Sequence, residues 1–311
     1  MHGKEENFMR QNCPETDVGT QDVRYTDSAW AKNALPYRPA DANKGDFGRL
    51  LVLTGSRLFP GAAALSLEGA LRLGVGYVTY SGAKVLVGEL VQKFPEVLYR
   101  PYTGNDEPTE ADVAEICALS AKQNATLIGC GCGRTECTLR LVRALFQVPN
   151  NPLILDADAL NAVASAGTDL LREAARPLIL TPHPLEFSRL SGWNVDYIQA
   201  NRIECATKFA AEYSCTLVLK GAGTVVTDGW RTYVNTTGSS ALAKAGSGDV
   251  LAGALSALTA YMKDRAAAAA LAVYLHGAAA DALEKEYSAF GVIPSDLPKE
   301  IGRQIVVLGQ K

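Results

Sequence analysis

From Arg49 onward, short apolar stretches alternate with longer amphipathic ones along the chain. The apolar stretches have the length of buried strands, and the amphipathic stretches have the spacing of helices. Strands are predicted at 49–54, 76–80, 125–129, 153–156, 178–181 and 216–220, and helices at 62–73, 109–122, 138–146 and 193–213. Buried strands that alternate with helices indicate a parallel sheet with helices on both faces.

This rhythm changes in the last third of the chain. Residues 224–227 and 230–234 flank Asp228-Gly229 and predict an antiparallel hairpin with a primed two-residue turn. Helices are predicted over 246–262, 265–287 and 295–308, and Asp264 is expected to cap the second of them. We therefore expect one mostly parallel α/β domain with an antiparallel edge.

The N-terminal residues 1–43 lack this regular pattern and are largely polar. They predict an extension ahead of a domain that spans 44–311, and the part up to about residue 24 is expected to be the most mobile. The first residues also lack the apolar segment of a signal peptide. No apolar run has the length needed to cross a bilayer, so a soluble, cytoplasmic protein is expected.

The charge and cysteine content of the chain limit the kinds of ligand and partner that are expected. The net charge is −3 and the basic residues are scattered, which argues against nucleic acid or an anionic membrane as a partner. The seven cysteines form no Cys-x-x-Cys pair and the three histidines are remote from them in sequence. Zinc is therefore not expected, and free thiols in a reducing cytosol are the default. An anionic small ligand would have to be held locally, by main-chain amides and one or two cations.

Glycine-rich and polar segments follow the carboxyl ends of the predicted strands. They lie at 55–56, 129–133, 156–158, 181–184 and 220–224. In open α/β sheets ligands bind beyond these strand ends, so this convergence predicts one shared site.

The turn around Asp249 carries the most specific chemistry. Gly246-Ser247-Gly248-Asp249 opens a predicted helix, so amides and the positive end of the helix dipole would face an anion. A carboxylate beside a phosphate is useful as a base that takes a proton from an attacking hydroxyl. The alternative is the glycine-cushioned start of a core helix, and this segment alone leaves the two readings level.

The other segments are less specific. The Gly-x-Gly-x-Gly run at 129–133 lacks the acidic residue that a dinucleotide site requires, so it is either a loop against a ligand or a tight turn. Asp156 either supports a neighbouring loop or holds magnesium, with support favoured, and Asp158 is expected to be an N-cap. His183 lies between two prolines, and a substrate contact is favoured over a purely structural role.

Together these residues resemble the ADP-dependent NAD(P)H-hydrate dehydratases, a branch of the ribokinase-like superfamily. The resemblance runs from about Lys44 to the C-terminus. It is sharpest in KGDFG (44–48), LDADALN (155–161), TPHPLEFSRL (181–190), KG (220–221) and GSGDVLAG (246–253). The family implies a three-layer αβα sandwich that repairs hydrated NADH or NADPH, with Mg²⁺ as cofactor and ADP or ATP as co-substrate.

The resemblance also implies roles for individual residues. Asp249 would be the catalytic carboxylate. The hydrated cofactor would contact Ala63, Gly131, His183, Pro184, Glu186, Phe187, Ser188, Arg189 and Asp249. The adenine nucleotide would be held by Lys220, Gly221, Ala222, Gly223, Thr224, Ser239, Gly246, Ser247 and Gly248. The family suggests a homotetramer, and no fused epimerase domain is expected.

Two segments depart from the family pattern. Asn235-Thr236-Thr237-Gly238-Ser239 stands where Asn-Pro-Thr-Gly-Asn is usual, and Ala245 begins the final turn where a glycine is usual. Both changes bear on nucleotide preference more than on reaction type. The rival functions are a ribokinase-like kinase of a vitamin-precursor alcohol, of the hydroxymethylpyrimidine or hydroxyethylthiazole type, and a non-catalytic nucleotide sensor.

Overall fold

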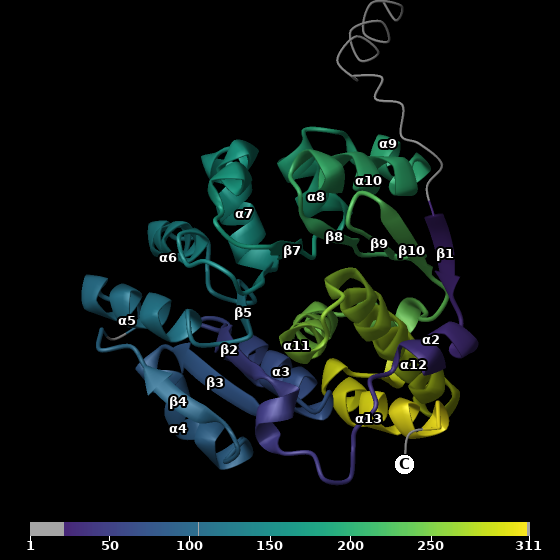
Figure 1. Ribbon diagram of the computed structural model, residues 1–311, viewed down its shortest axis with the longest axis horizontal. Helices are drawn as coiled ribbons and strands as arrows, with labels where there is room; N and C mark the ends of the chain where they lie inside the picture. The colour runs from purple at the N-terminus through teal and green to yellow at the C-terminus, as the bar shows by residue number, and fades with distance from the viewer. Residues whose placement is uncertain (1–21, 105, 310–311) are drawn as a thin grey trace, which may run out of the picture.

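The computed structural model describes residues 22–104 and 106–309. These residues form a ten-stranded sheet with the order β1-β10-β9-β8-β7-β6-β5-β2-β3-β4 (Figure 1). The strands are β1 (Asp22–Thr26), β2 (Arg49–Leu53), β3 (Tyr77–Gly82), β4 (Leu98–Pro101), β5 (Ala125–Ile128), β6 (Leu153–Leu155), β7 (Leu178–Leu180), β8 (Thr216–Leu219), β9 (Val225–Thr227) and β10 (Arg231–Asn235). The neighbouring pairs are parallel except where β9 meets β8 and β10.

Helices cover both faces of the sheet, as predicted. The first face carries α2 (Ser28–Ala34), α3 (Pro60–Arg72), α4 (Lys84–Lys93), α11 (Ser247–Tyr261), α12 (Arg265–Gly291) and α13 (Leu297–Val307). The second carries α5 (Glu110–Ser120), α6 (Glu136–Phe146), α7 (Ala157–Ala166), α8 (Pro184–Ser191), α9 (Val195–Ala200) and α10 (Arg202–Glu212). The predicted three-layer α/β architecture is confirmed.

The strands divide their side chains between the two cores. In β2, Leu50 and Val52 pack into the core of the first face, whereas Leu51 and Leu53 pack into that of the second. Successive strand residues point to opposite faces, so a strand buried on both sides must be apolar throughout. This is why the central strands were visible as unbroken apolar runs.

The edge of the sheet formed by β1, β10 and β9 differs from the prediction. Strand β1 pairs with β10, and Trp30 of α2 packs its ring 5.3 Å from that of Tyr233, so residues 22–34 belong to the folded body. Residues 1–21, including most of the segment expected to be mobile, lie outside the described residues. The hairpin is confirmed, but its ladder ends at Thr227 and Thr232. The primed two-residue turn was wrong, because three residues, 228–230, connect the strands and Asp228 Oδ1 accepts from the amides of Trp230 and Arg231.

Helix α11 is held against α3 by unusually close main-chain contact. A Cβ atom built on Gly253 would lie 1.9 Å from the carbonyl oxygen of Ser66, and one built on Gly69 would lie 2.4 Å from that of Val250. Only glycine allows the two backbones to approach so closely. This contact fixes the N-terminus of α11 beside the carboxyl ends of the central strands.

Helix α12 is the longest helix in the described part of the chain. Within the described chain it is long and apolar enough to cross a membrane, which the sequence analysis did not anticipate, but 78% of its most apolar window is buried in the protein. The predicted N-cap is confirmed, since Asp264 accepts from the amide of Ala267. Core packing accounts for its composition.

Candidate active site

The turn before α11 has the geometry of an anion-binding helix start. Gly246 is the N-cap and has φ +102°, a conformation that favours glycine. A Cβ atom there would lie 2.7 Å from Leu65 and 3.2 Å from Pro294. Because no side chain caps the helix, its first amides and its dipole are directed at whatever lies beyond the turn. Asp249 occupies the first turn, as predicted.

A buried ion pair lies beside this turn. Asp156, which directly follows β6, is 1% exposed and accepts a 2.8 Å hydrogen bond from Nζ of Lys220, which directly follows β8. Thr181 Oγ1 donates to the same Asp156 oxygen at 2.6 Å, and Cys130 Sγ donates to the other at 3.3 Å. The ends of four neighbouring strands are thus tied together by one carboxylate, which agrees with the supporting role favoured for Asp156.

Asp249 is electrostatically coupled to this ion pair. Ligand atoms of Cys130, Asp156 and Asp249 all lie within 4.8 Å of one another. Burial and, to a smaller extent, the Asp156 charge raise the pKa of Asp249 to about 6, against the opposing effects of Lys220 and of a hydrogen bond from Cys130. A carboxyl group with a pKa near neutrality suits proton transfer better than an ordinary surface aspartate.

Lys220 links this cluster to the loop after β7. Burial alone would lower the pKa of Lys220, but the charges of Asp156 and Glu186 raise it, so the side chain stays an ammonium. Its Nζ lies 4.0 Å from Glu186 Oε2. Burial raises the pKa of Glu186, and Lys220 counteracts that shift. The Lys220 ammonium therefore interacts both with Asp156 after β6 and with Glu186 in the first turn of α8.

His183 has a structural role that the sequence analysis had ranked second. Its Nδ1 accepts from the amides of Leu185 and Glu186, and the Glu186 side chain accepts from the His183 amide, which forms a capping box on α8. Pro184 occupies the predicted first turn. Burial lowers the pKa of His183 and Lys220 lowers it further, so the ring is neutral and carries its proton on Nε2. The Asp156–Lys220 pair acts on both His183 and Asp249, so the two side chains flank the same charges.

The remaining residues of the 181–190 segment separate into two groups. Phe187 is fully buried between Trp193 and Phe209, so its side chain does not reach the charged cluster. Ser188 donates to the Trp193 carbonyl oxygen, whereas the exposed Arg189 donates to Asn161 Oδ1 at 2.7 Å. The predicted substrate contacts therefore rest on the His183 and Arg189 side chains and on the helix main chain.

Two further predicted cofactor contacts, Ala63 and Gly131, lie where the glycine-rich loop 129–133 meets α3. Ala63 is fully buried in α3 next to Gly55. Gly131 has φ +64°, and a Cβ atom there would lie 2.7 Å from Ala62 and 2.9 Å from Phe59. The 129–133 run thus packs a loop against α3. Asp158 is not the N-cap that was predicted, because α7 begins at Ala157 with Asp156 at the N-cap position, and the Asp158 carboxylate instead accepts from the Gly133 amide at 2.8 Å.

The predicted nucleotide segments lie on either side of Lys220. Gly221, Ala222 and Gly223 are exposed, and Thr224 folds back to donate to the Gly221 carbonyl oxygen. Ser239 caps a short 3₁₀ turn, Ser240–Leu242, that leads to Gly246. A Cβ atom on Gly248 would lie 3.6 Å from Lys220 Nζ, so the two segments meet at the lysine.

The carboxylates fit a magnesium ion only in part. Asp156 and Asp249 offer the oxygen ligands that Mg²⁺ prefers, whereas the Cys130 thiol is unsuitable and Lys220 already occupies Asp156. Mg²⁺ commonly keeps few protein ligands and binds substrate phosphates. The site therefore fits a metal held mainly by a nucleotide, with Asp249 or Asp156 as a direct or water-mediated ligand.

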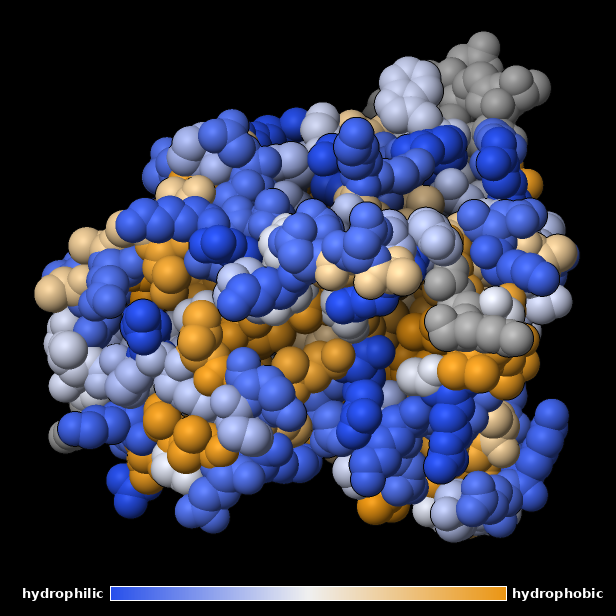
Figure 2. Space-filling view, turned by 60° about the horizontal axis from the view of Figure 1, so that its bottom comes forward, coloured by the Kyte–Doolittle hydropathy of each residue, from blue (hydrophilic) through white to orange (hydrophobic). Residues whose placement is uncertain are grey.

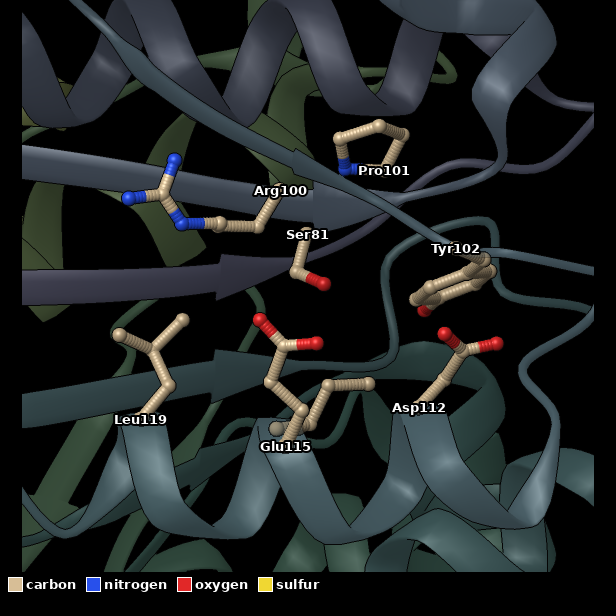
Figure 3. Close-up of a pocket in the computed structure, with 8 residues that line it drawn as sticks. Ser81, Arg100, Pro101, Tyr102, Asp112, Glu115 and Leu119 are labelled. Carbon is tan, nitrogen blue, oxygen red and sulfur yellow. The ribbon is translucent and has the colours of Figure 1, made fainter.

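A separate pocket lies between β4 and α5, away from this cluster (Figure 3). It encloses about 80 Å³, and Figure 3 shows the Glu115 carboxylate pointing from α5 toward Ser81 and the Asp112 carboxylate pointing toward Tyr102. Ligand sites for small molecules usually enclose several hundred Å³. Asp112 is also occupied in capping α5, where it accepts from the Thr109 amide and from Thr103. This pocket is therefore not a second nucleotide site.

The family is decided by comparison with known proteins. Residues 50–303 match the family model described as NAD(P)H-hydrate dehydratase. The chain belongs to this family. It is 37% identical to an ADP-dependent (S)-NAD(P)H-hydrate dehydratase of Bacillus subtilis, over 85% of this chain and 91% of the relative. The similarity extends to a bifunctional NAD(P)H-hydrate repair enzyme Nnr of Moorella thermoacetica, 37% identical over 91% of this chain and 54% of the relative. The chain spans about half the length of such bifunctional relatives.

The fold comparison agrees. A crystal structure of the ADP/ATP-dependent NAD(P)H-hydrate dehydratase from Bacillus subtilis, co-crystallized with ATP/Mg²⁺, matches with a TM-score of 0.82 and 32% identity. The match covers 92% of this chain and 99% of that one. A ribokinase-like superfamily protein of Enterococcus faecalis matches with a TM-score of 0.82 at 23% identity, which supports the fold alone.

Proposed function

We propose that the protein repairs hydrated NADH and NADPH by an ADP- or ATP-dependent dehydration of the S epimer. The observation that carries this proposal is the half-buried Asp249 carboxylate, with its pKa raised to about 6, at a helix start whose amides face outward beside Lys220. The family match and the similarity to dehydratases of this specificity support the same activity.

The geometry suggests how the chain would act on its substrate. Hydrated NADH carries a hydroxyl on the saturated carbon next to the ring nitrogen, and hydroxide is a poor leaving group. Asp249 accepts the proton of this hydroxyl, whose oxygen attacks the terminal phosphorus of ADP or ATP and displaces AMP or ADP. The ring nitrogen then expels inorganic phosphate as the C–O bond breaks, and loss of a neighbouring proton restores the dihydropyridine.

The charges around Asp249 have separate tasks in this scheme. The first amides of α11 and the Lys220 ammonium stabilise negative charge on the transferring phosphoryl group. Asp156 and Glu186 keep Lys220 charged and in place. Bound Mg²⁺ would neutralise phosphate charge, with Asp249 or Asp156 as its nearest protein ligand. His183, fixed as the N-cap of α8, and Arg189 offer donors to the hydrated cofactor.

The predicted domain division is part of the proposal. We assign the activity to residues 44–311, to whose sheet the preceding strand β1 and helix α2 are joined. The family match over residues 50–303 supports this division. A cytoplasmic location suits a protein that repairs NADH and NADPH.

A homotetramer remains a proposal drawn from the resemblance. Several large apolar side chains are exposed on α12 and α13, including Phe290 at 95%, Val306 at 64% and Val307 at 73%. Figure 2 shows apolar patches between polar residues on one face of the molecule. Light scattering after size-exclusion chromatography distinguishes a tetramer from a monomer by mass.

One optical assay tests the function. Acid-hydrated NADH is incubated with the protein, Mg²⁺ and either ADP or ATP, and the NADH absorbance and released phosphate are followed. A dehydratase restores the absorbance and releases phosphate in equal amounts. A kinase of a vitamin-precursor alcohol would leave both unchanged, and so would a nucleotide sensor.

A further inference from the structure

A second hollow lies at the amino ends of the strands, whereas the Asp249 cluster lies at their carboxyl ends. It encloses about 180 Å³ between the first residues of β2, β3 and β4 and the C-terminal end of α5. Arg49 is paired with Tyr77 and Thr79 with Leu98, so these side chains project from the same face of the sheet. We call this hollow the amino-end pocket, and its lining includes Arg49, Tyr77, Leu98, Arg100, Leu119 and Lys122.

The amino-end pocket is lined by three cations and by no carboxylate. Arg49 comes from β2, Arg100 from β4 and Lys122 from the loop after α5, and all three residues are exposed. None of them forms an ion pair within the described residues. The whole chain carries 33 acidic and 30 basic residues, so a cavity whose charged side chains are all positive is contrary to its composition.

The ring of Tyr77 brings a fourth cation to the same place. Arg49 Cζ lies 4.9 Å and Lys44 Nζ lies 5.0 Å from the centre of this ring. A cation over an aromatic face is attracted by the ring quadrupole, which keeps both charges beside the pocket. Like charges held together repel one another, and a bound anion offsets this repulsion.

Lys122 is not needed to complete the C-terminal end of α5. Lysines near a helix end often donate to its last carbonyl groups. Here the Leu119 carbonyl oxygen accepts from Gln123 Nε2, and that of Ser120 accepts from Asn151 Nδ2. The Lys122 ammonium is therefore available to a ligand in the pocket.

Arg100 also keeps donors for a ligand. Its Nη1 donates to the Tyr99 carbonyl oxygen at 3.0 Å, which leaves Nε and Nη2 as the fork that binds two oxygens of one phosphate or carboxylate group. Glu115 is the nearest candidate to neutralise it, since both residues line the neighbouring pocket. Figure 3 shows the Arg100 guanidinium directed away from the Glu115 carboxylate, so the charge remains available.

We propose that the amino-end pocket binds a small phosphate monoester. Arg49 and Arg100 donate to the phosphate oxygens, and Lys122 supplies a further positive charge. The side chains of Leu98 and Leu119 pack against the organic group. Pockets for larger ligands enclose several hundred Å³, so the ester is smaller than a nucleotide. The site lies apart from the Asp249 cluster, and its ligand binds in addition to Mg-ADP.

Calorimetry in a phosphate-free buffer tests this proposal on the full chain. The titrants are phenyl phosphate, phenyl sulfate, which has the same shape and a single negative charge, and inorganic phosphate, which lacks the organic group. Phenyl phosphate is titrated with and without saturating Mg-ADP. The variants are Arg100→Gln and Lys122→Gln. The matched control is Lys285→Gln, because Lys285 is an exposed lysine of α12 outside the pocket.

Phenyl phosphate should bind more tightly than phenyl sulfate or inorganic phosphate, because it combines two negative charges with an apolar group. Arg100→Gln and Lys122→Gln should each weaken its binding about three- to tenfold, since each removes one charged donor, and Lys285→Gln should bind as the wild type does. Unchanged affinity in both pocket variants, or no saturable binding to the wild type, would overturn the proposal. Equal affinity for inorganic phosphate and phenyl phosphate would show that the ligand is not a monoester.

The titration with Mg-ADP separates this pocket from the Asp249 cluster. Saturating Mg-ADP should leave the affinity of phenyl phosphate unchanged, whereas competition would place the phosphate at the Asp249 cluster and contradict the proposal. A protein that restores no NADH, or that does not bind Mg-ADP, refutes the proposed function. The pocket variants would still decide whether the amino-end pocket binds phenyl phosphate.

Discussion

Charged groups are buried at both the amino ends and the carboxyl ends of the parallel strands, but their hydrogen bonding differs. At the amino end Arg176 is 5% exposed, and its guanidinium donates to the carbonyl oxygens of Asn151, Leu145 and Pro152 and to Ser120 Oγ. Burial lowers its pKa to about 10. Each nitrogen of the guanidinium has an acceptor, so this group serves to join strand starts to helix ends.

At the carboxyl ends of the strands, some buried polar and charged groups lack hydrogen-bond or ion-pair partners within the described part of the protein. Asp249 lies close to a second carboxylate, its pKa is raised to about 6, and unpaired atoms of Ser247 and His276 lie nearby. Such crowding lowers stability unless a ligand completes it. The comparison teaches that complete hydrogen bonding marks a structural charge in this fold, whereas incomplete hydrogen bonding marks the site.

The largest expected effect concerns the base itself. Asp249→Asn keeps the shape of the side chain but removes its ability to accept a proton, so the turnover of acid-hydrated NADH should fall by about 10²–10⁴-fold. Mg-ADP should still bind, because the metal is held mainly by the nucleotide. The NADH absorbance assay and calorimetry measure these two quantities, and near-normal turnover in a variant that binds nucleotide would contradict the assignment.

A substitution at the amino ends of the strands should lower stability and leave turnover unchanged. Arg176→Met should lower the free energy of unfolding by about 2–3 kcal/mol, because several buried acceptors lose their donor. Turnover at temperatures below the transition should stay near that of the wild type. Denaturant unfolding and the absorbance assay check both parts, and a stable variant with lost activity would remove the contrast between the two ends.

A smaller effect separates the two roles of His183. His183→Ala should cost about 1 kcal/mol of stability, because the N-cap of α8 is lost. His183→Ser can restore the cap without the imidazole, so its stability should return toward the wild-type value. If the ring also contacts the hydrated cofactor, KM stays raised in both variants. Equal KM values in all three proteins would leave His183 with capping alone.

The sequence predicted the central layer well, for a simple physical reason. Strands β2, β3 and β5–β8 are mostly buried on both faces and must be apolar, which makes them visible as runs. Edge strands β1 and β4 expose most of their residues and left no such signal. The long predicted helix 193–213 is divided at Asn201, where φ is −132°. Local pattern does not report a break that tertiary packing sets.

The candidate site was predictable in its location and less so in its contacts. Strand ends of a parallel sheet meet at one edge, and this places Asp156, Lys220 and Asp249 together without any knowledge of side chains. The capping role of His183, the burial of Phe187 and the position of His276 depend on how helices pack.

The pH dependence of kcat/KM for acid-hydrated NADH tests the central claim most directly. Asp249 must be ionised to act as a base, so activity should rise with pH through about 6, where its pKa lies. Asp156→Asn removes a negative charge that raises this pKa and frees Lys220 to lower it, so the acidic limb should move to lower pH. A wild-type profile that is flat between pH 5 and 7, or a limb that stays in place in Asp156→Asn, would contradict the account.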